Sequence, residues 1–277
     1  MRYFTVAAVV ALAFATSAAG QESPKVSLGW KFSKGETLRY EVNSLYEVTG
    51  ASAQSRDGVL LLALQVTEVG KDGNASLKVT IEKCTSGGVS YTKLAGKSFT
   101  MSMSRLGQVS EVKGLKELMK SVDEDGDDED GDDDDGDEDD GDEDGDDDES
   151  AWMQQCFPLM PSAALVKGNT VEQDATCKEG QGAVRMKSTL KELRDGGKLA
   201  LVDQGWTFEP KKGAANGVAS ATSSSEISWL VERGALQSHK TVLSYAGSAN
   251  GSEYTVKTTV SVKLAAEKAK AEGARQK

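Results

Sequence analysis

Near the end of the chain, apolar and polar side chains alternate along Tyr254–Leu264, with Tyr, Val, Thr or Leu at every second position. Successive side chains of a β-strand point to opposite faces of its sheet, so this period predicts a strand with one buried and one solvated face. Shorter versions of the pattern occur in Leu38–Val42, Leu77–Ile81 and Phe99–Met103. These runs predict a mainly β fold.

Turn-forming residues separate the predicted strands. Val59–Val66 is almost continuously apolar, which is typical of a central strand that is covered on both faces. Gly70–Asn74 and Arg194–Gly197 are rich in Gly and Asp, which tolerate the positive φ angles of tight hairpin turns. The sheet is therefore expected to be antiparallel.

The two halves of the chain carry similar signals in the same order. The matched pairs are Lys34–Leu38 with Lys167–Val171, Lys71–Gly73 with Arg194–Gly196, and Ser104–Val109 with Glu232–Leu236. One interpretation is a duplicated strand module, which predicts a curved antiparallel sheet or half-barrel built from two similar halves. The alternative is that any two series of antiparallel hairpins resemble each other.

These signals divide the chain into five parts. They are a leader (residues 1–20), a first β half (21–121), an acidic run (122–150), a second β half (151–264) and a charged tail (265–277). Gly114–Lys120 and Ala151–Phe157, on either side of the acidic run, are expected to form one or two short helices.

The acidic run separates the charge of the chain into two unlike parts. Every residue from Asp123 to Glu149 is Asp, Glu or Gly, and this stretch holds half of the 44 acidic residues. The remaining acidic residues are outnumbered by 32 Lys and Arg, so the rest of the chain is basic. Repulsion between like charges and the lack of apolar residues predict that the run is disordered.

Clustered carboxylates provide the hard oxygen ligands that Ca²⁺ prefers. No placement of the run's glycines at the sixth position of an EF-hand loop also supplies the required acidic ligands. A weak, diffuse calcium site thus remains one hypothesis, and the others are a tether for a basic protein partner, a contact with the chain's own basic body, or a solvating spacer. The candidate ligands are Asp123, Asp125, Asp128, Asp130, Asp133, Asp135, Asp140, Asp142 and Asp144.

The first residues have the pattern of a secretory signal peptide. Arg2 precedes the apolar run Val6–Ala15, and small residues at Ser17–Gly20 predict cleavage near residue 20. The apolar run is too short to span a bilayer, and no later segment is long and apolar enough. The product is expected to be secreted or periplasmic, without a membrane span.

An exported protein meets an oxidising environment, where cysteines form disulfides. Cys156 and Cys177 flank a region that contains Pro158 and Pro161, and this pair is the tentative disulfide. Cys84 would then remain a free thiol.

Catalytic motifs are missing from the sequence. The single histidine, His239, alternates with apolar positions at Leu236 and Val242 and is expected on the solvated face of a strand. No serine lies in a GxSxG context, and there is no Walker-type or GxGxxG phosphate loop. The dispersed basic residues and the acidic run also disfavour nucleic-acid binding. We expect a protein that is not an enzyme and has no cofactor.

Four tryptophans remain to be placed: Trp30, Trp152, Trp206 and Trp229. Core packing is the simple expectation for Trp30 and Trp229, which lie in alternating segments. The alternative is that some tryptophans line a concave apolar surface for a lipid or another apolar ligand.

Three segments resemble a known pattern: GWKFSKGETLRYEV at Gly29–Val42, SRLGQVSEVKG at Ser104–Gly114 and FPLMPSAALVKGNTV at Phe157–Val171. They are similar to an uncharacterised family of secreted β-rich proteins of planctomycete-type bacteria. The chain departs from that pattern at Asn169 and Val171, where the family usually has Asp and Trp. The resemblance implies a sheet like the half-barrels of periplasmic lipoprotein carriers, and no catalytic residues.

Together these observations predict an exported, non-enzymatic binding or structural protein of the bacterial envelope. Two further functions are kept as alternatives: weak binding of calcium or a basic partner through the acidic run, and transport of an apolar ligand on a concave sheet.

Overall fold

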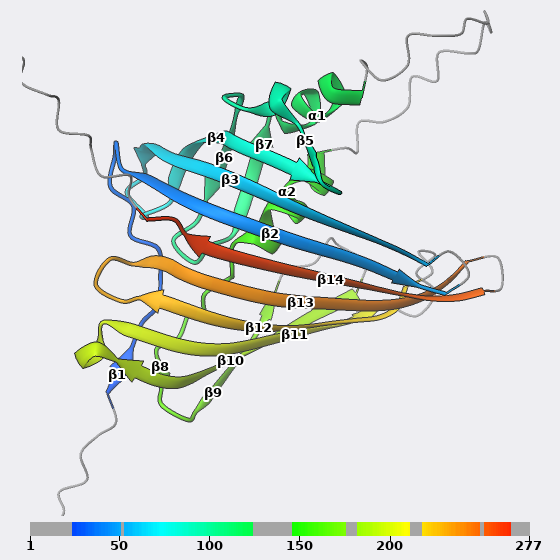
Figure 1. The fold of residues 1–277 in the computed structure, drawn as a ribbon. Coiled ribbons are helices and arrows are strands. Elements are labelled where there is room, and N and C mark those ends of the chain that lie inside the picture. The colour runs from blue at the N-terminus through cyan, green and yellow to red at the C-terminus, as the bar shows by residue number, and fades with distance from the viewer. Residues whose placement is uncertain are drawn as a thin grey trace, which may run out of the picture.

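The computed structural model describes residues 24–50, 53–123, 146–175, 182–210, 218–249 and 252–266. The mainly β prediction is confirmed: one antiparallel sheet of 12 strands forms most of the molecule, and a two-stranded sheet accompanies it (Figure 1). The leader, nearly all of the acidic run and most of the charged tail lie outside the described residues.

The first half contributes six strands to the main sheet. They are β2 (Thr37–Thr49), β3 (Gln54–Val69), β4 (Ala75–Ser86), β5 (Val89–Ser90), β6 (Ser98–Met103) and β7 (Val109–Lys113). The predicted strands at Leu38–Val42, Val59–Val66, Leu77–Ile81 and Phe99–Met103 all lie within these elements. A short 3₁₀ turn, η1 (Thr92–Leu94), precedes β6.

The second half contributes the other six strands. They are β9 (Thr170–Ala175), β10 (Gly182–Arg194), β11 (Leu199–Pro210), β12 (Val218–Leu230), β13 (Ala235–Ala249) and β14 (Ser252–Leu264). The turn η2 (Asp195–Gly197) joins β10 to β11 where a hairpin was predicted. The small second sheet pairs β1 (Lys25–Val26) with β8 (Leu165–Val166).

The strand order of the sheet is β7-β6-β4-β3-β2-β14-β13-β12-β11-β10-β9, and the twelfth strand, β5, pairs with β4 beside this path. Each half is thus a meander, and both meanders advance across the sheet in the same direction. The halves join where β14 pairs with β2 in the middle of the sheet. Within the described residues the edge strands β7 and β9 do not pair with each other, so the sheet is an open, curved half-barrel (Figure 1).

Both halves enter the sheet through the same turn. Gly35 and Gly168 have φ angles of 84° and 80°, in the left-handed region that favours glycine. The Gly35 N–H donates to the Val66 carbonyl at 2.8 Å, and the Gly168 N–H donates to the Leu190 carbonyl at 2.9 Å. The equivalent bonds support the prediction of two similar halves.

A β-bulge also recurs at the same place in each half. Thr67 is the extra residue between β3 and β4, and it directly follows Val66. Lys191 is the extra residue between β10 and β11, and it directly follows Leu190. Because bulges and their register are specific features of a strand pair, this agreement goes beyond a general likeness of antiparallel hairpins.

Side chains from both halves meet on one face of the sheet. We call this face, which carries Tyr40 of β2, the hollow face. Trp30 lies at the centre of this core: its ring is 5.0 Å from Trp229, 6.0 Å from Phe157 and 6.4 Å from Tyr40, all edge-on. The expectation that Trp30 and Trp229 pack in the core is confirmed, because both are almost fully buried. The N-terminal segment thereby ties the two halves together.

The two predicted helices form but extend further into the acidic run than expected. They are α1 (Leu115–Asp123) and α2 (Asp146–Cys156). The expected disorder of residues 122–150 stays a prediction, because nearly all of that stretch lies outside the described residues. Helix α2 packs against β7 and β14 on the hollow side of the sheet.

Candidate functional site

Strand pairing aligns side chains of the second half into rows on the hollow face, because directly paired residues share a face of the sheet. The innermost row consists of Leu190, Val202, Ile227 and His239. The middle row is polar and consists of Ser188, Gln204, Ser225 and Thr241. The outer row consists of Met186, Trp206, Ser223 and Leu243.

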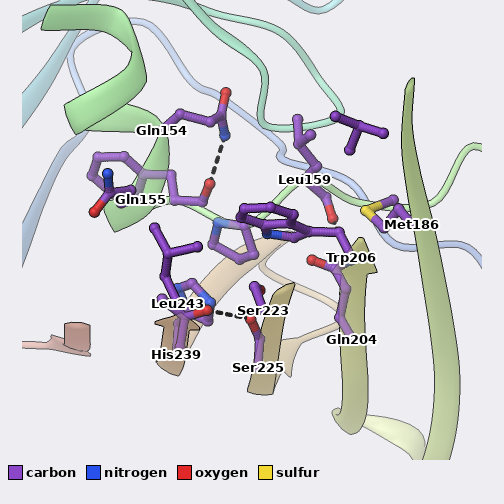
Figure 2. Close-up of a pocket in the computed structure, with 14 residues that line it drawn as sticks. Gln154, Gln155, Leu159, Met186, Gln204, Trp206, Ser223, Ser225, His239 and Leu243 are labelled. Atoms are coloured by element: carbon purple, nitrogen blue, oxygen red, sulfur yellow. Dashed lines mark hydrogen bonds between the residues drawn. The ribbon is translucent and has the colours of Figure 1, made fainter. Parts of the chain in front are cut away.

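A cavity of about 340 Å³ lies between these rows and residues 154–159 (Figure 2). We call residues 154–159 the roof of the cavity. The roof comprises the end of α2 and the loop that follows it. The walls are mostly apolar and include Phe157, Met186, Trp206 and Leu243. This volume is near the lower end of the range of about 300–1,000 Å³ that is usual for small-molecule pockets.

The roof is held by the side chain of Gln154. Its Oε1 accepts a hydrogen bond from the Val109 N–H at 2.9 Å. Its Nε2 donates to the carbonyls of Gly107 at 3.0 Å and Phe157 at 2.7 Å. A single amide thus joins α2, the roof loop and the start of β7, so the cavity is formed without a ligand.

A glycine lets the roof approach the core closely. A Cβ on Gly107 would lie 2.4 Å from the Pro158 carbonyl oxygen and 2.9 Å from Trp30 Nε1. Because atoms cannot approach so closely, a side chain at this position would push the roof away from the sheet.

The polar floor of the cavity is also hydrogen-bonded. Gln204 Nε2 donates to the Leu159 carbonyl at 2.7 Å and to Ser188 Oγ at 3.1 Å. The hydroxyls of Ser225 and Thr241 share a hydrogen bond of 2.6 Å (Figure 2). These bonds connect the roof to the sheet and satisfy most of the middle row.

Two polar side chains of the cavity differ from this pattern. His239 and Ser223 are 4% and 9% exposed, and neither ring nitrogen of His239 nor Ser223 Oγ makes a hydrogen bond within the described residues. Buried polar groups are normally paired, so such groups require an explanation in the site itself. Burial lowers the pKa of His239 from 6.5 to about 4, and the nearby backbone of Cys156 only partly opposes this shift. His239 is therefore neutral at neutral pH.

The burial of His239 corrects the expectation that it lies on the solvated face. The register of β12 and β13 shifts between Ser228 and Trp229, and this shift leaves Gln237 as an extra residue. A bulge reverses which positions face the core, so His239 follows Leu236 onto the hollow face. No signal in the sequence marks this bulge.

The described lining of the cavity contains no charged side chain. The 14 lining residues include no Asp, Glu, Lys or Arg, and His239 is the one titratable side chain among them. A charged ligand group would lose its hydration here without gaining an opposite charge, which is unfavourable.

Burial differs between the rows of the cavity. Leu190, Ile227 and His239 of the innermost row are buried, whereas the outer row combines buried Met186 and Ser223 with partly exposed Trp206 and Leu243. Further out, Phe208 and Tyr245 continue the hollow face with partly exposed aromatic rings, and partly exposed Tyr46 extends the outer row through Thr258. Burial, with the adjacent hydroxyls of Tyr46 and Tyr254, raises the pKa of Tyr245. The cavity thus opens onto an apolar surface.

The predicted ligand residues are not part of this cavity. Asp123 is the last residue of α1, and the other candidate calcium ligands, Asp125, Asp128, Asp130, Asp133, Asp135, Asp140, Asp142 and Asp144, lie outside the described residues. In the part of the chain that the structure describes, no group of three or more His, Cys, Asp and Glu side chains could hold a metal ion. The calcium hypothesis stays a prediction.

The tentative disulfide also stays a prediction, because Cys177 lies outside the described residues. Cys156 is buried at the end of α2, and burial raises the pKa of its thiol to about 12. Cys84 is partly buried in β4, which raises the pKa of its thiol.

Of the four tryptophans, Trp206 lines the cavity, as the concave-surface alternative anticipated. No helix of the described ranges has the length and apolar character needed to cross a membrane.

Comparison with known protein families finds one matching profile. The profile of a family described as "Family of unknown function (DUF6263)" matches residues 73–218, which is just over half of the chain. A comparison with curated proteins finds no match.

The solved structures that align with the chain include the following two. One, entitled "Lipid-protein interactions in lipovitellin", has a TM-score of 0.51 at 10% sequence identity and covers 85% of this chain. The chain spans about a quarter, 26%, of that lipovitellin chain, so the likeness concerns the fold of one part. The other is DynF from the dynemicin biosynthesis pathway of Micromonospora chersina, with a TM-score of 0.21, 10% identity, and coverage of 89% of this chain and 86% of that one.

Proposed function

The chain belongs to the DUF6263 family of unknown function, and we propose that it binds a small apolar molecule between the hollow face of its sheet and the roof. The observation that carries this proposal is a cavity of about 340 Å³ with mainly apolar walls, which is formed before any ligand is present. Burial of apolar ligand surface is the main source of affinity in such a site.

The construction of the roof supports binding. Gln154 and Gln204 hold the roof with hydrogen bonds, so little ordering is required when a ligand enters. A preformed site avoids part of the entropic cost of binding. The lipovitellin structure, whose title concerns lipid–protein interactions, has a similar fold and supports a lipid-like ligand.

We propose binding without chemical turnover. Ser223 Oγ and His239 are not hydrogen-bonded to each other, although an activated nucleophile needs a base within reach. No carboxylate of the described lining is available to orient the imidazole. These features favour a binding protein over a hydrolase.

We further propose that binding takes place outside the cytoplasm. The support is the charged start, short apolar run and small residues of the leader, which lies outside the described residues. A carrier that shields an apolar molecule from water would be useful in the periplasm or the exterior.

The test uses N-phenylnaphthylamine, an uncharged fluorescent probe, with the full chain without its leader. We expect saturable binding that is about tenfold weaker in Leu243→Trp, because the larger ring fills part of the cavity. Val242→Trp is the matched control, since Val242 is the next residue on β13 and faces away from the hollow face.

The affinity of Val242→Trp should equal that of the unmodified chain, and both variants should keep the far-ultraviolet circular dichroism of a β protein. Equal affinities in all three proteins would show that the probe binds elsewhere and would contradict the proposed site.

A further inference from the structure

The inner end of the cavity carries an unused hydrogen-bonding group, the imidazole of His239. This side chain lies in the innermost row on β13, among Ile227 of β12 and Val262 of β14, and is almost fully buried. A neutral imidazole has one donor nitrogen and one acceptor nitrogen. Neither makes a hydrogen bond within the described residues.

The protein itself can account for one nitrogen at most. The backbone of Cys156 lies close enough to influence the ring, and a small movement would let its carbonyl accept the imidazole N–H. The other nitrogen would then be the acceptor. Ser225 and Thr241, which belong to the adjacent middle row on β12 and β13, bond to each other. The acceptor nitrogen is therefore left for a donor from a ligand.

The surroundings restrict the charge of that donor. No acidic or basic side chain belongs to the described lining, so an ammonium group would be buried without a counter-charge. An ionised sulfate or carboxylate would have the same difficulty and could not donate to the ring. An uncharged O–H or amide N–H meets both conditions.

The partial exposure of Trp206 and Leu243 gives the direction of the ligand. The closed end holds His239, whereas the open end carries the partly exposed apolar side chains of Trp206 and Leu243. An amphiphile that entered with its apolar end first would place a hydrocarbon against an unsatisfied imidazole. Entry with the polar end first pairs the imidazole with the polar group of the ligand and places the hydrocarbon chain against the apolar side chains of Trp206 and Leu243.

Resting on the proposed function, we infer that the ligand is a short-chain amphiphile with an uncharged hydrogen-bond donor, such as a hydroxyl or a primary amide. Its polar end is bound by His239, and its chain runs outward past Ser223 over Trp206 and Leu243. The unpaired Ser223 hydroxyl lies along this path and is available to a second polar group of the ligand.

The test compares four amphiphiles with the same chain length as competitors of the fluorescent probe. Decanol has an uncharged donor, decyl methyl ether lacks the O–H, and decylammonium and decyl sulfate are charged. We expect decanol to bind about tenfold more tightly than the ether, as a hydrogen bond to a buried group implies. Both charged compounds should bind more weakly than decanol.

Two variants assign the preference to His239. His239→Phe keeps a flat ring without an acceptor and should remove the advantage of decanol over the ether, while His239→Gln keeps an acceptor and should retain part of it. Ser224→Ala is the matched control and should leave the preference unchanged, because Ser224 is the next residue on β12 and faces away from the hollow face.

The outcomes separate this inference from the proposed function. Tight binding of all amphiphiles with no preference for the O–H, or a preference that survives in His239→Phe, would overturn the inference and leave an apolar cavity. Failure of every amphiphile to displace the probe would contradict both.

Discussion

The buried imidazole of His239 shows how one residue links packing to function. It occupies a core position, yet it contributes two polar atoms that the rest of the described protein does not satisfy. Such a group costs stability in the free protein, and a ligand that pairs with it recovers part of that cost. The imidazole at this position therefore lowers the stability of the free protein but offers a hydrogen-bonding group to a ligand.

The same burial makes the stability of the fold depend on pH. The pKa of His239 is 6.5 in a solvated chain and about 4 in the folded protein, so the unfolded chain binds the proton first as the pH falls. The free energy of unfolding should be unaffected by His239 above about pH 6.5 and should decrease by about 3 kcal/mol between pH 6.5 and 4.

Urea unfolding at a series of pH values, compared with His239→Phe, measures this contribution. The chain has no other histidine, so the difference between the two proteins in this range belongs to His239. Parallel losses of stability in both proteins would show that the imidazole is not desolvated in the fold.

At the scale of elements, the molecule is a strand meander that occurs twice. The turns before β2 and β9 and the bulges that follow in β3 and β10 occupy equivalent positions. What differs is the covering of the hollow face. The cavity lies over β10–β13 of the second half, and the roof over it comes from the connection between the halves.

Equivalent turns should respond equally to the same substitution. Gly35→Ala and Gly168→Ala should each lower the free energy of unfolding by about 1–2 kcal/mol, because both positions have left-handed backbone and open space around a new Cβ. Thermal unfolding of the two variants provides the comparison. Lys34→Ala and Lys167→Ala, one residue earlier in each turn, serve as controls and should be nearly neutral. Clearly unequal costs of the two glycine substitutions would argue against a duplicated module.

At the scale of the whole molecule, a basic β body is combined with a strongly acidic segment. The acidic run connects α1 to α2, and α2 leads directly into the roof. The acidic run and the cavity are thus separate parts of the molecule that are joined through α2.

Removal of residues 124–145, with a short Gly-Ser linker in their place, tests the function of this segment while α2 is kept. If the carboxylates bind calcium, calorimetry should show saturable heat at about millimolar calcium in the full chain and none in the shortened chain. Probe affinity in the cavity provides the control and should be the same in both proteins. Equal calcium heats would identify the run as a spacer or as a tether for a basic partner.

Local patterns in the sequence were sufficient to predict most of the elements. The alternation of Tyr254–Leu264 corresponds to β14, and Gly70–Asn74 forms the turn between β3 and β4. These features depend on neighbouring residues alone, because the pleat and the turn geometry act over a few positions. The likeness of the two halves was also visible, since each half repeats the same local signals.

The tertiary structure decided which residues form the candidate site. The bulge at Gln237 changes the face of every later position on β13, and only the pairing with β12 reveals it. The roof depends on the hydrogen bond that Gln154 accepts from Val109 and on the one that it donates to Gly107, and both partners are distant in the sequence. The cavity and its buried histidine therefore arise from long-range register and packing, while the strands themselves follow from local alternation.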